Sequence, residues 1–389
     1  MRRAPPARPA PRQGGPATST YLDTVSTEAL HPAARETLLS ALDRGWADPL
    51  RLHGAGREAR LLLDNAREVV AALLGSRPDE VSFTSSGTAA VHLGVLGLLL
   101  GRRRVSPRLV HTAVEHSAVL SAGAWWARHF SGTADGVPVD AQGHVRLDAL
   151  DDALAQGAGV AAVQVANPEV GTLQPWPEVA RTAARHDVPV FADACAAAGR
   201  VDLPDGWAAA AASAHKWGGP AGVGVLLVRK GARWRAPFPT DDRTDARVAG
   251  FENVPAALAA AAALQAVVAE RTVVAARQHA LVDRLRAALH AVQDVDVVGD
   301  PAARLPHVLT FSCLYVDGES LVTELDRRGF AVASGSACTA SSLEPSHVLA
   351  AMGALTHGNV RVSLTRDTTE ADVDRLVATL PDVLAQLRP

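Results

Sequence analysis

The stretch Val188-Pro189-Val190-Phe191-Ala192 ends in Asp193, and 23 residues beyond Asp193 lies Lys216 in Ser213-Ala214-His215-Lys216-Trp217-Gly218-Gly219-Pro220. A continuous apolar run is typical of a parallel strand that is buried on both faces. Asp193 therefore stands at the carboxyl end of a strand, where the ligands of open α/β sheets bind. A helix-sized gap and a second short strand bring Lys216 to the same edge. Together the two segments predict an α/β sheet with a carboxylate and a lysine at its ligand-binding edge.

Apolar runs alternate with longer amphipathic stretches through the first two thirds of the chain. This alternation is the pattern of a doubly wound α/β sheet. The predicted strands are residues 80–83, 108–111, 159–165, 188–192 and 223–228. The predicted helices include residues 56–74, 89–100 and 176–186.

The pattern changes after about residue 269. A long helix over residues 271–292 precedes short strands at 307–312, 331–333 and 360–363, and then a closing helix from Glu370. Thr369 and Asp372 have the spacing of a capping box at the start of that helix. We therefore predict four parts of the chain. They are a disordered tail rich in Pro, Arg, Ala and Gly (1–20), a segment packing with the small domain (21–35), a large cofactor-binding domain (36–268) and a small α+β domain (269–389).

Composition argues against several classes of protein. The net charge of −3 gives no reason to expect binding to nucleic acid or to an anionic membrane. The longest apolar stretch, 255–269, is mostly alanine and is predicted as a buried soluble helix rather than a membrane span. The three cysteines, Cys195, Cys313 and Cys338, lack metal-ligand spacing and cannot all pair. We expect a cytoplasmic protein without a metal site.

The chain contains two lysines, Lys216 and Lys230, against 36 arginines. A lysine amine can lose its proton and condense with a carbonyl, whereas a guanidinium stays protonated. Lys216 is therefore a candidate to form a Schiff base. Lys230 ends an apolar run and has the pattern of a turn residue. The alternative is that an arginine-rich composition retained two lysines by chance.

A pyridoxal phosphate (PLP) site accounts for Lys216 and Asp193 together. PLP needs a lysine for the imine and a carboxylate that keeps its ring nitrogen protonated. It also needs a cradle for its phosphate. Gly87 and Thr88 lie where a predicted strand turns into a helix, and a helix N-terminus binds phosphate.

Three further side chains complete the predicted site. Ser213 and His215 flank Ala214, so both can turn toward the phosphate. His116 follows another strand and is placed to cover the cofactor ring. Taken singly, these residues have competing explanations as caps, turn residues or core residues.

The order of these motifs resembles that of fold-type-I PLP enzymes of the class V aminotransferase superfamily, and within it the cysteine desulfurases. The matching segments are 21–23, 83–88, 115–120, 167–172, 193–194, 213–216 and 334–339. The resemblance implies a large domain with a mostly parallel seven-stranded sheet, a smaller α+β C-terminal domain, PLP as cofactor and a homodimer. In such dimers the neighbouring subunit completes the cofactor site.

The resemblance also assigns residues. The segment around Cys338 is similar to the loop that bears the sulfur-accepting cysteine, and a thiol in a Ser/Gly/Ala loop suits a reactive nucleophile. Arg361 would hold the substrate α-carboxylate, with a structural salt bridge as the alternative. Asn167 would contact cofactor and substrate. Cys195 and Cys313 are expected to be packing residues.

Three positions depart from the family pattern. Pro168 stands where the family usually has asparagine or a related polar group, Ala196 where it has glutamine, and Phe251 where it has threonine. These changes affect the polar surroundings of the cofactor. They leave Lys216 and Asp193 in place.

The resemblance predicts a cysteine desulfurase that converts L-cysteine to L-alanine. Lys216 would move the substrate α-proton, Cys338 would accept the sulfur as a persulfide, and His116 would shuttle a proton before an acceptor protein takes the sulfur. The alternatives are a selenocysteine lyase, another PLP-dependent C–S lyase or aminotransferase, and a catalytically degenerate sulfur-relay subunit. The sulfur acceptor is left open.

Overall fold

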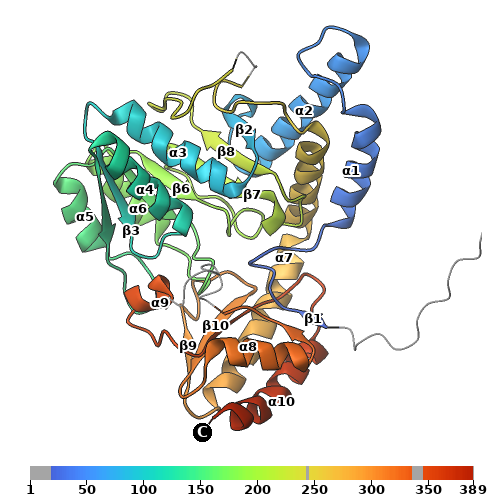
Figure 1. Cartoon of the computed structure of the whole chain (residues 1–389), viewed down its shortest axis with the longest axis vertical. Helices are drawn as coiled ribbons and strands as arrows, with labels where there is room; N and C mark the ends of the chain where they lie inside the picture. The colour runs from blue at the N-terminus through green and yellow to red at the C-terminus, as the bar shows by residue number, and fades with distance from the viewer. Residues whose placement is uncertain (1–18, 242–244, 335–344, 389) are drawn as a thin grey trace, which may run out of the picture.

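A seven-stranded sheet forms the centre of the larger part of the molecule (Figure 1). The computed structural model describes residues 19–241, 245–334 and 345–388. The sheet order is β2 (Val81–Thr84), β8 (Gly224–Val228), β7 (Ala209–Ser213), β6 (Val190–Asp193), β5 (Val160–Gln164), β3 (Arg108–Thr112) and β4 (Thr133–Val137). Six of these strands run in the same direction, and β8 runs in the opposite direction between β2 and β7. The predicted fold class, with a mostly parallel seven-stranded sheet, is confirmed.

Helices cover both faces of this sheet (Figure 1). On one face lie α3 (Gly87–Arg102) and α4 (Ser117–Phe130), and on the other lie α2 (Gly54–Leu73), α5 (Leu147–Ala155), α6 (Trp176–Arg185) and the first half of α7 (Val254–His290). Helix α1 (Pro32–Arg44) runs beside α7. The backbone of α3 approaches the sheet closely, because a Cβ at Gly94 would lie 2.2 Å from the Phe191 ring.

A smaller α+β unit contains the C-terminal part of the chain. Its antiparallel sheet has the order β12 (Asn359–Ser363), β10 (Val308–Cys313) and β9 (Val295–Val298). Strand β1 (Thr20–Tyr21) pairs in parallel with β11 (Phe330–Ala331), so the N-terminal segment joins this unit. The helices are α8 (Gly318–Arg327), α9 (His347–Ala351) and α10 (Glu370–Leu387), and the predicted capping box of Thr369 and Asp372 is formed.

Helix α7 is continuous where the sequence pattern predicts two helices, and the predicted domain division at residue 268 lies inside it. Its first half, from Val254 to Leu264, packs in the core of the large unit, and Leu281 to Leu289 pack in the core of the small one. Within the described residues, α7 alone is long and apolar enough to cross a membrane, by length and composition only. Core helices of soluble proteins meet the same criterion.

Candidate active site

A cavity of about 260 Å³ lies at the carboxyl ends of the parallel strands. Asp193 is the last residue of β6, and Ser213 is the last residue of β7. A short 3₁₀ turn, Ala214–Lys216, follows β7 and carries His215 and Lys216. The cavity brings together these predicted site residues: Gly87, Thr88, His116, Asp193, Ser213, His215 and Lys216. The structure therefore gathers seven residues from four separate segments of the chain.

One end of the cavity has the features of a phosphate site. Gly87 begins α3 after Ser86, whose hydroxyl accepts a hydrogen bond from Ala89 N at 3.1 Å. A Cβ at Gly87 would lie 2.7 Å from Ser213 Cβ, so only glycine allows this close approach. Burial, and then the charge of Lys216, lower the pKa of His215 to about 4. The N-terminus of α3 and the Ser213 hydroxyl offer neutral donors to an anion.

The other end of the cavity holds the ionisable groups. Asp193 is 6% exposed, and its Oδ1 accepts a hydrogen bond from Cys195 N at 2.9 Å. His116 caps α4, because its Nδ1 accepts from Ala118 N at 3.1 Å, which leaves Nε2 for other partners. Burial is the main cause that lowers the pKa of His116, and Lys216 lowers it further against the opposite effect of Asp193. A neutral imidazole is therefore favoured, and it can accept a proton.

Cys195 and Cys313 remain protonated thiols. Burial raises the pKa of Cys195 well above its ordinary value, and the Asp193 carboxylate raises it further. Burial raises the pKa of Cys313 to about 11. Because the thiolate is the nucleophilic form, neither residue suits nucleophilic chemistry. Cys338 lies outside the described residues.

Two other predicted contact residues lie away from the cavity wall. Asn167 is fully buried, and its Oδ1 accepts from Glu169 N and Val170 N while its Nδ2 donates to Val114 O. The wall at this point is formed instead by the neighbours of Asn167, Ala166 and Pro168. The role of Asn167 as a cofactor or substrate contact stays a prediction.

Arg361 comes from β12 of the small unit and is 2% exposed. Its Nη2 lies 2.9 Å from Asp23 Oδ1, so the ion pair that was the alternative to substrate binding is present. Its Nε has no hydrogen-bond partner among the described residues. The substrate role of Arg361 also stays a prediction.

The sequence patterns missed Gln164 and Glu115. Gln164 pairs in register with Asp193 across β5 and β6 and lines the cavity, and its buried Oε1 lacks a partner in the described chain. Glu115 lies behind it, where Oε1 accepts from Thr112 Oγ1 at 2.7 Å and from Gln164 N at 2.9 Å. A glutamine inside an otherwise apolar strand was the available signal.

Glu115 predicts a specific dependence of stability on pH. Burial raises the pKa of Glu115 to about 8 from 4.5, and Asp193 contributes to this shift. Between these values the unfolded chain releases a proton that the folded chain keeps, so this group destabilises the fold as pH rises, by at most about 1.4 kcal/mol per pH unit. Glu115→Gln keeps an acceptor oxygen and removes the titration. Its free energy of unfolding, measured with urea at several pH values from 5 to 8, should decline less steeply than that of the wild type. Equal slopes would contradict a buried neutral carboxyl.

The residues of the cavity fit PLP. Lys216 offers an amine, Asp193 a buried carboxylate, and the close contact of Gly87 with Ser213 a cradle that a side chain would fill. This fold and site are those of a class-V aminotransferase enzyme. The family model described as Aminotransferase class-V matches residues 20–376, and the chain belongs to this family, within its cysteine desulfurase branch.

Relatives within that branch match over nearly their whole length. An IscS-like cysteine desulfurase from Mycobacterium tuberculosis is 38% identical, with 95% of this chain and 97% of the relative covered. A cysteine desulfurase NifS from Azotobacter vinelandii is 36% identical, with 95% and 93% covered. A solved NifS-like protein superposes with a TM-score of 0.87 at 27% identity, covering 95% of this chain and all of that one.

Proposed function

We propose that the protein is a PLP-dependent cysteine desulfurase that converts L-cysteine to L-alanine and transfers the sulfur to Cys338 as a persulfide. The names of its relatives support this activity. The observation that carries the proposal is that Lys216 and Asp193 line one cavity at the carboxyl edge of the sheet. An acceptor protein or enzyme then takes the sulfur. We also propose a cytoplasmic location.

Seven residues of the cavity would hold PLP. Bound PLP supplies an aldehyde that condenses with amines and a ring that accepts electrons. Lys216 would anchor it covalently, and the Asp193 carboxylate would favour a protonated ring nitrogen because opposite charges attract. Gly87, Thr88, Ser213 and His215 would hold the phosphate, and His116 would cover the ring.

Lys216 and His116 would carry out the proton transfers of the reaction. Lys216 Nζ donates to the carbonyl oxygens of Val25 and Ser26, so its amine is held by a neighbouring segment that it must leave in order to react. Once released by substrate, Lys216 would remove the α-proton. The neutral His116 would carry a proton between the Cys338 thiol and the cofactor.

The departures from the family pattern bear on how tightly PLP is held. Pro168 and Ala196 both line the cavity and offer it no side-chain hydrogen bond. Gln164 brings a carboxamide to the same cavity. It is a candidate to replace part of the polar contact that a glutamine at position 196 would give.

A second copy of the chain would cover an exposed apolar surface. Several large apolar side chains of α1, α2 and the link between them are more than half exposed. They are Leu39, Leu42, Trp46, Leu52 and Leu61. Phe251 is also 60% exposed and occupies the place from which we expect contact with the neighbouring subunit. Light scattering should therefore give about twice the 40.5 kDa of one chain, and a monomer that retains PLP would contradict the dimer.

The activity is tested with purified protein, L-cysteine and a thiol reductant. Equal yields of alanine and sulfide, with an absorbance band of bound PLP, are expected. Preference for selenocysteine would identify the lyase, and a keto acid without sulfide would identify an aminotransferase. Protein that binds no PLP but accepts sulfur would identify a relay subunit.

A further inference from the structure

One turn of the N-terminal segment, residues 23–26, contacts two residues of the proposed active site at once. We call it the N-terminal turn. Val25 O and Ser26 O accept hydrogen bonds from Lys216 Nζ. The Asp23 carboxylate and the Ser26 hydroxyl each lie 2.9 Å from Nη2 of Arg361. The turn thus joins a residue of the large unit to a residue of the small unit.

The N-terminal turn is itself fixed from several sides. Ser26 N donates to Asp23 O at 3.1 Å, and the Tyr21 hydroxyl donates to both Asp23 O and Thr27 O. On the small unit, Val25 N donates to Ser363 Oγ at 3.1 Å. The backbone that carries Asp23 is therefore held in place by hydrogen bonds where Asp23 contacts Arg361.

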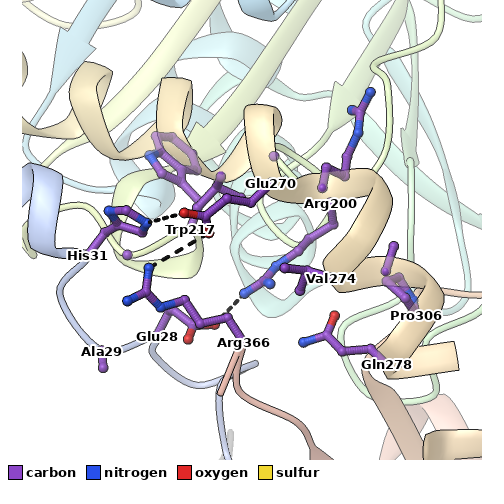
Figure 2. Close-up of a pocket in the computed structure, with 15 residues that line it drawn as sticks. Glu28, Ala29, His31, Arg200, Trp217, Glu270, Val274, Gln278, Pro306 and Arg366 are labelled. Atoms are coloured by element: carbon purple, nitrogen blue, oxygen red, sulfur yellow. Dashed lines mark hydrogen bonds and ion pairs between the residues drawn. The ribbon is translucent and has the colours of Figure 1, made fainter. Parts of the chain in front are cut away.

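The residues after the turn are anchored to the loop of Lys216. Glu28 N donates to His215 O at 2.8 Å, and the Glu28 carboxylate pairs with Arg200, which also donates to Lys216 O. Figure 2 shows Arg200 and Glu28 pointing toward one another, with His31 and Arg366 both directed at Glu270. These ion pairs keep the segment in place against the large unit.

The guanidinium of Arg361 is only partly used. Nη2 is shared by Asp23 and Ser26, and Nη1 donates to Pro168 O at a long 3.4 Å. Nε is buried without a partner in the described chain. A buried donor without a partner is unfavourable, and a carboxylate is the acceptor that guanidinium binds best. Because Asp23 fixes Nη2, the orientation of the whole planar group is set, and Nε keeps a donor that nothing in the described chain uses.

We propose that Asp23 is a positioning residue for substrate: with Ser26 it holds Arg361 so that the guanidinium receives the α-carboxylate of an amino acid. This inference rests on the proposed function and on the substrate role of Arg361. To orient Arg361, the side chain at position 23 must offer an acceptor oxygen to Nη2, and its negative charge is less important for this role. Asparagine at position 23 keeps that oxygen, whereas alanine removes it.

The test compares two variants of Asp23 in the PLP-loaded enzyme. Asp23→Ala should raise KM for L-cysteine by roughly 10–100-fold, because a misplaced Arg361 loses its charge-assisted contact with the substrate carboxylate, and should change kcat by less than about 3-fold. Asp23→Asn should restore KM to within a few-fold of the wild type. Inhibition by L-alanine should weaken in Asp23→Ala, whereas inhibition by cysteamine, which lacks a carboxylate, should not.

Asp374→Ala is the matched control, since it removes an arginine ion pair at the exposed surface of the small unit. An unchanged KM in Asp23→Ala, or equal effects of Ala and Asn, would overturn the positioning role. If Asp23→Ala fails to fold, Ser26→Ala is tested in its place. The positioning role then predicts a few-fold rise in KM for L-cysteine, and an unchanged KM would overturn it. A wild type that releases no sulfide would instead overturn the proposed function, so the two failures are distinguishable.

Discussion

Lys216→Arg is expected to reduce alanine and sulfide formation by at least about 1,000-fold and to abolish covalent attachment of PLP. Arginine keeps the positive charge beside Val25 and Ser26, but its guanidinium does not condense with an aldehyde or accept a proton at neutral pH. Borohydride reduction of the wild type, followed by peptide mapping, should place the pyridoxyl group on Lys216. The same treatment of the variant should leave no labelled peptide.

The chain supplies an unusually clean control for this experiment, because Lys230 is its other lysine and lies exposed at the end of β8. Lys230→Arg should retain the label and full turnover. A pyridoxyl group on Lys230 in the wild type, or activity in Lys216→Arg, would show that the imine forms elsewhere.

Cys338→Ser is expected to eliminate the protein persulfide and to lower sulfide release by at least about 100-fold. A serine hydroxyl is a far weaker nucleophile than a thiolate. The PLP absorbance should stay intact, because the cysteine is proposed to act on sulfur rather than to hold the cofactor. Mass spectrometry of the protein after incubation with L-cysteine measures the persulfide directly.

Cys313→Ala provides the comparison for this variant, since Cys313 is a buried thiol of the small unit with a pKa of about 11. That variant should still form the persulfide. Retention of the persulfide in Cys338→Ser would move the acceptor to another thiol and reject the assignment of Cys338.

The central sheet could be predicted from the sequence because its middle strands are buried on both faces. Strands β3, β5, β6 and β8 each lie within two residues of the predicted bounds. The edge strand β4, Thr133–Val137, escaped prediction because only Val137 of its five residues is buried, and Gly136 and Asp135 disfavour a strand. Strand β9 is likewise only partly buried. An apolar pattern in the sequence therefore identifies a strand that is buried, but it does not identify a strand that is paired in a sheet and largely exposed.

Lys216 and Asp193 could be predicted as neighbours because a parallel sheet brings the carboxyl ends of its strands to one edge. The turn at residues 23–26 could not, because its contact with Arg361 spans more than 330 positions and has no periodic signal. Glu115 was missed for a related reason. It precedes a histidine in a turn, and its pKa is raised by burial in the folded chain and then by Asp193, neither of which the sequence displays.

The pairing of the first described strand with the last third of the chain has a consequence for biosynthesis. Leu22 N donates to Ala331 O, and Ser363 N donates to Leu22 O, so Leu22 is made on the ribosome long before either of its partners. Such non-local contacts form slowly and late. The large unit can collapse while the chain is still being translated, but the segment that braces Lys216 and Arg361 has no place to dock until translation has passed Ser363. A nascent chain that stops before Ser363 therefore lacks these contacts, and the site is finished only after Ser363 has been made.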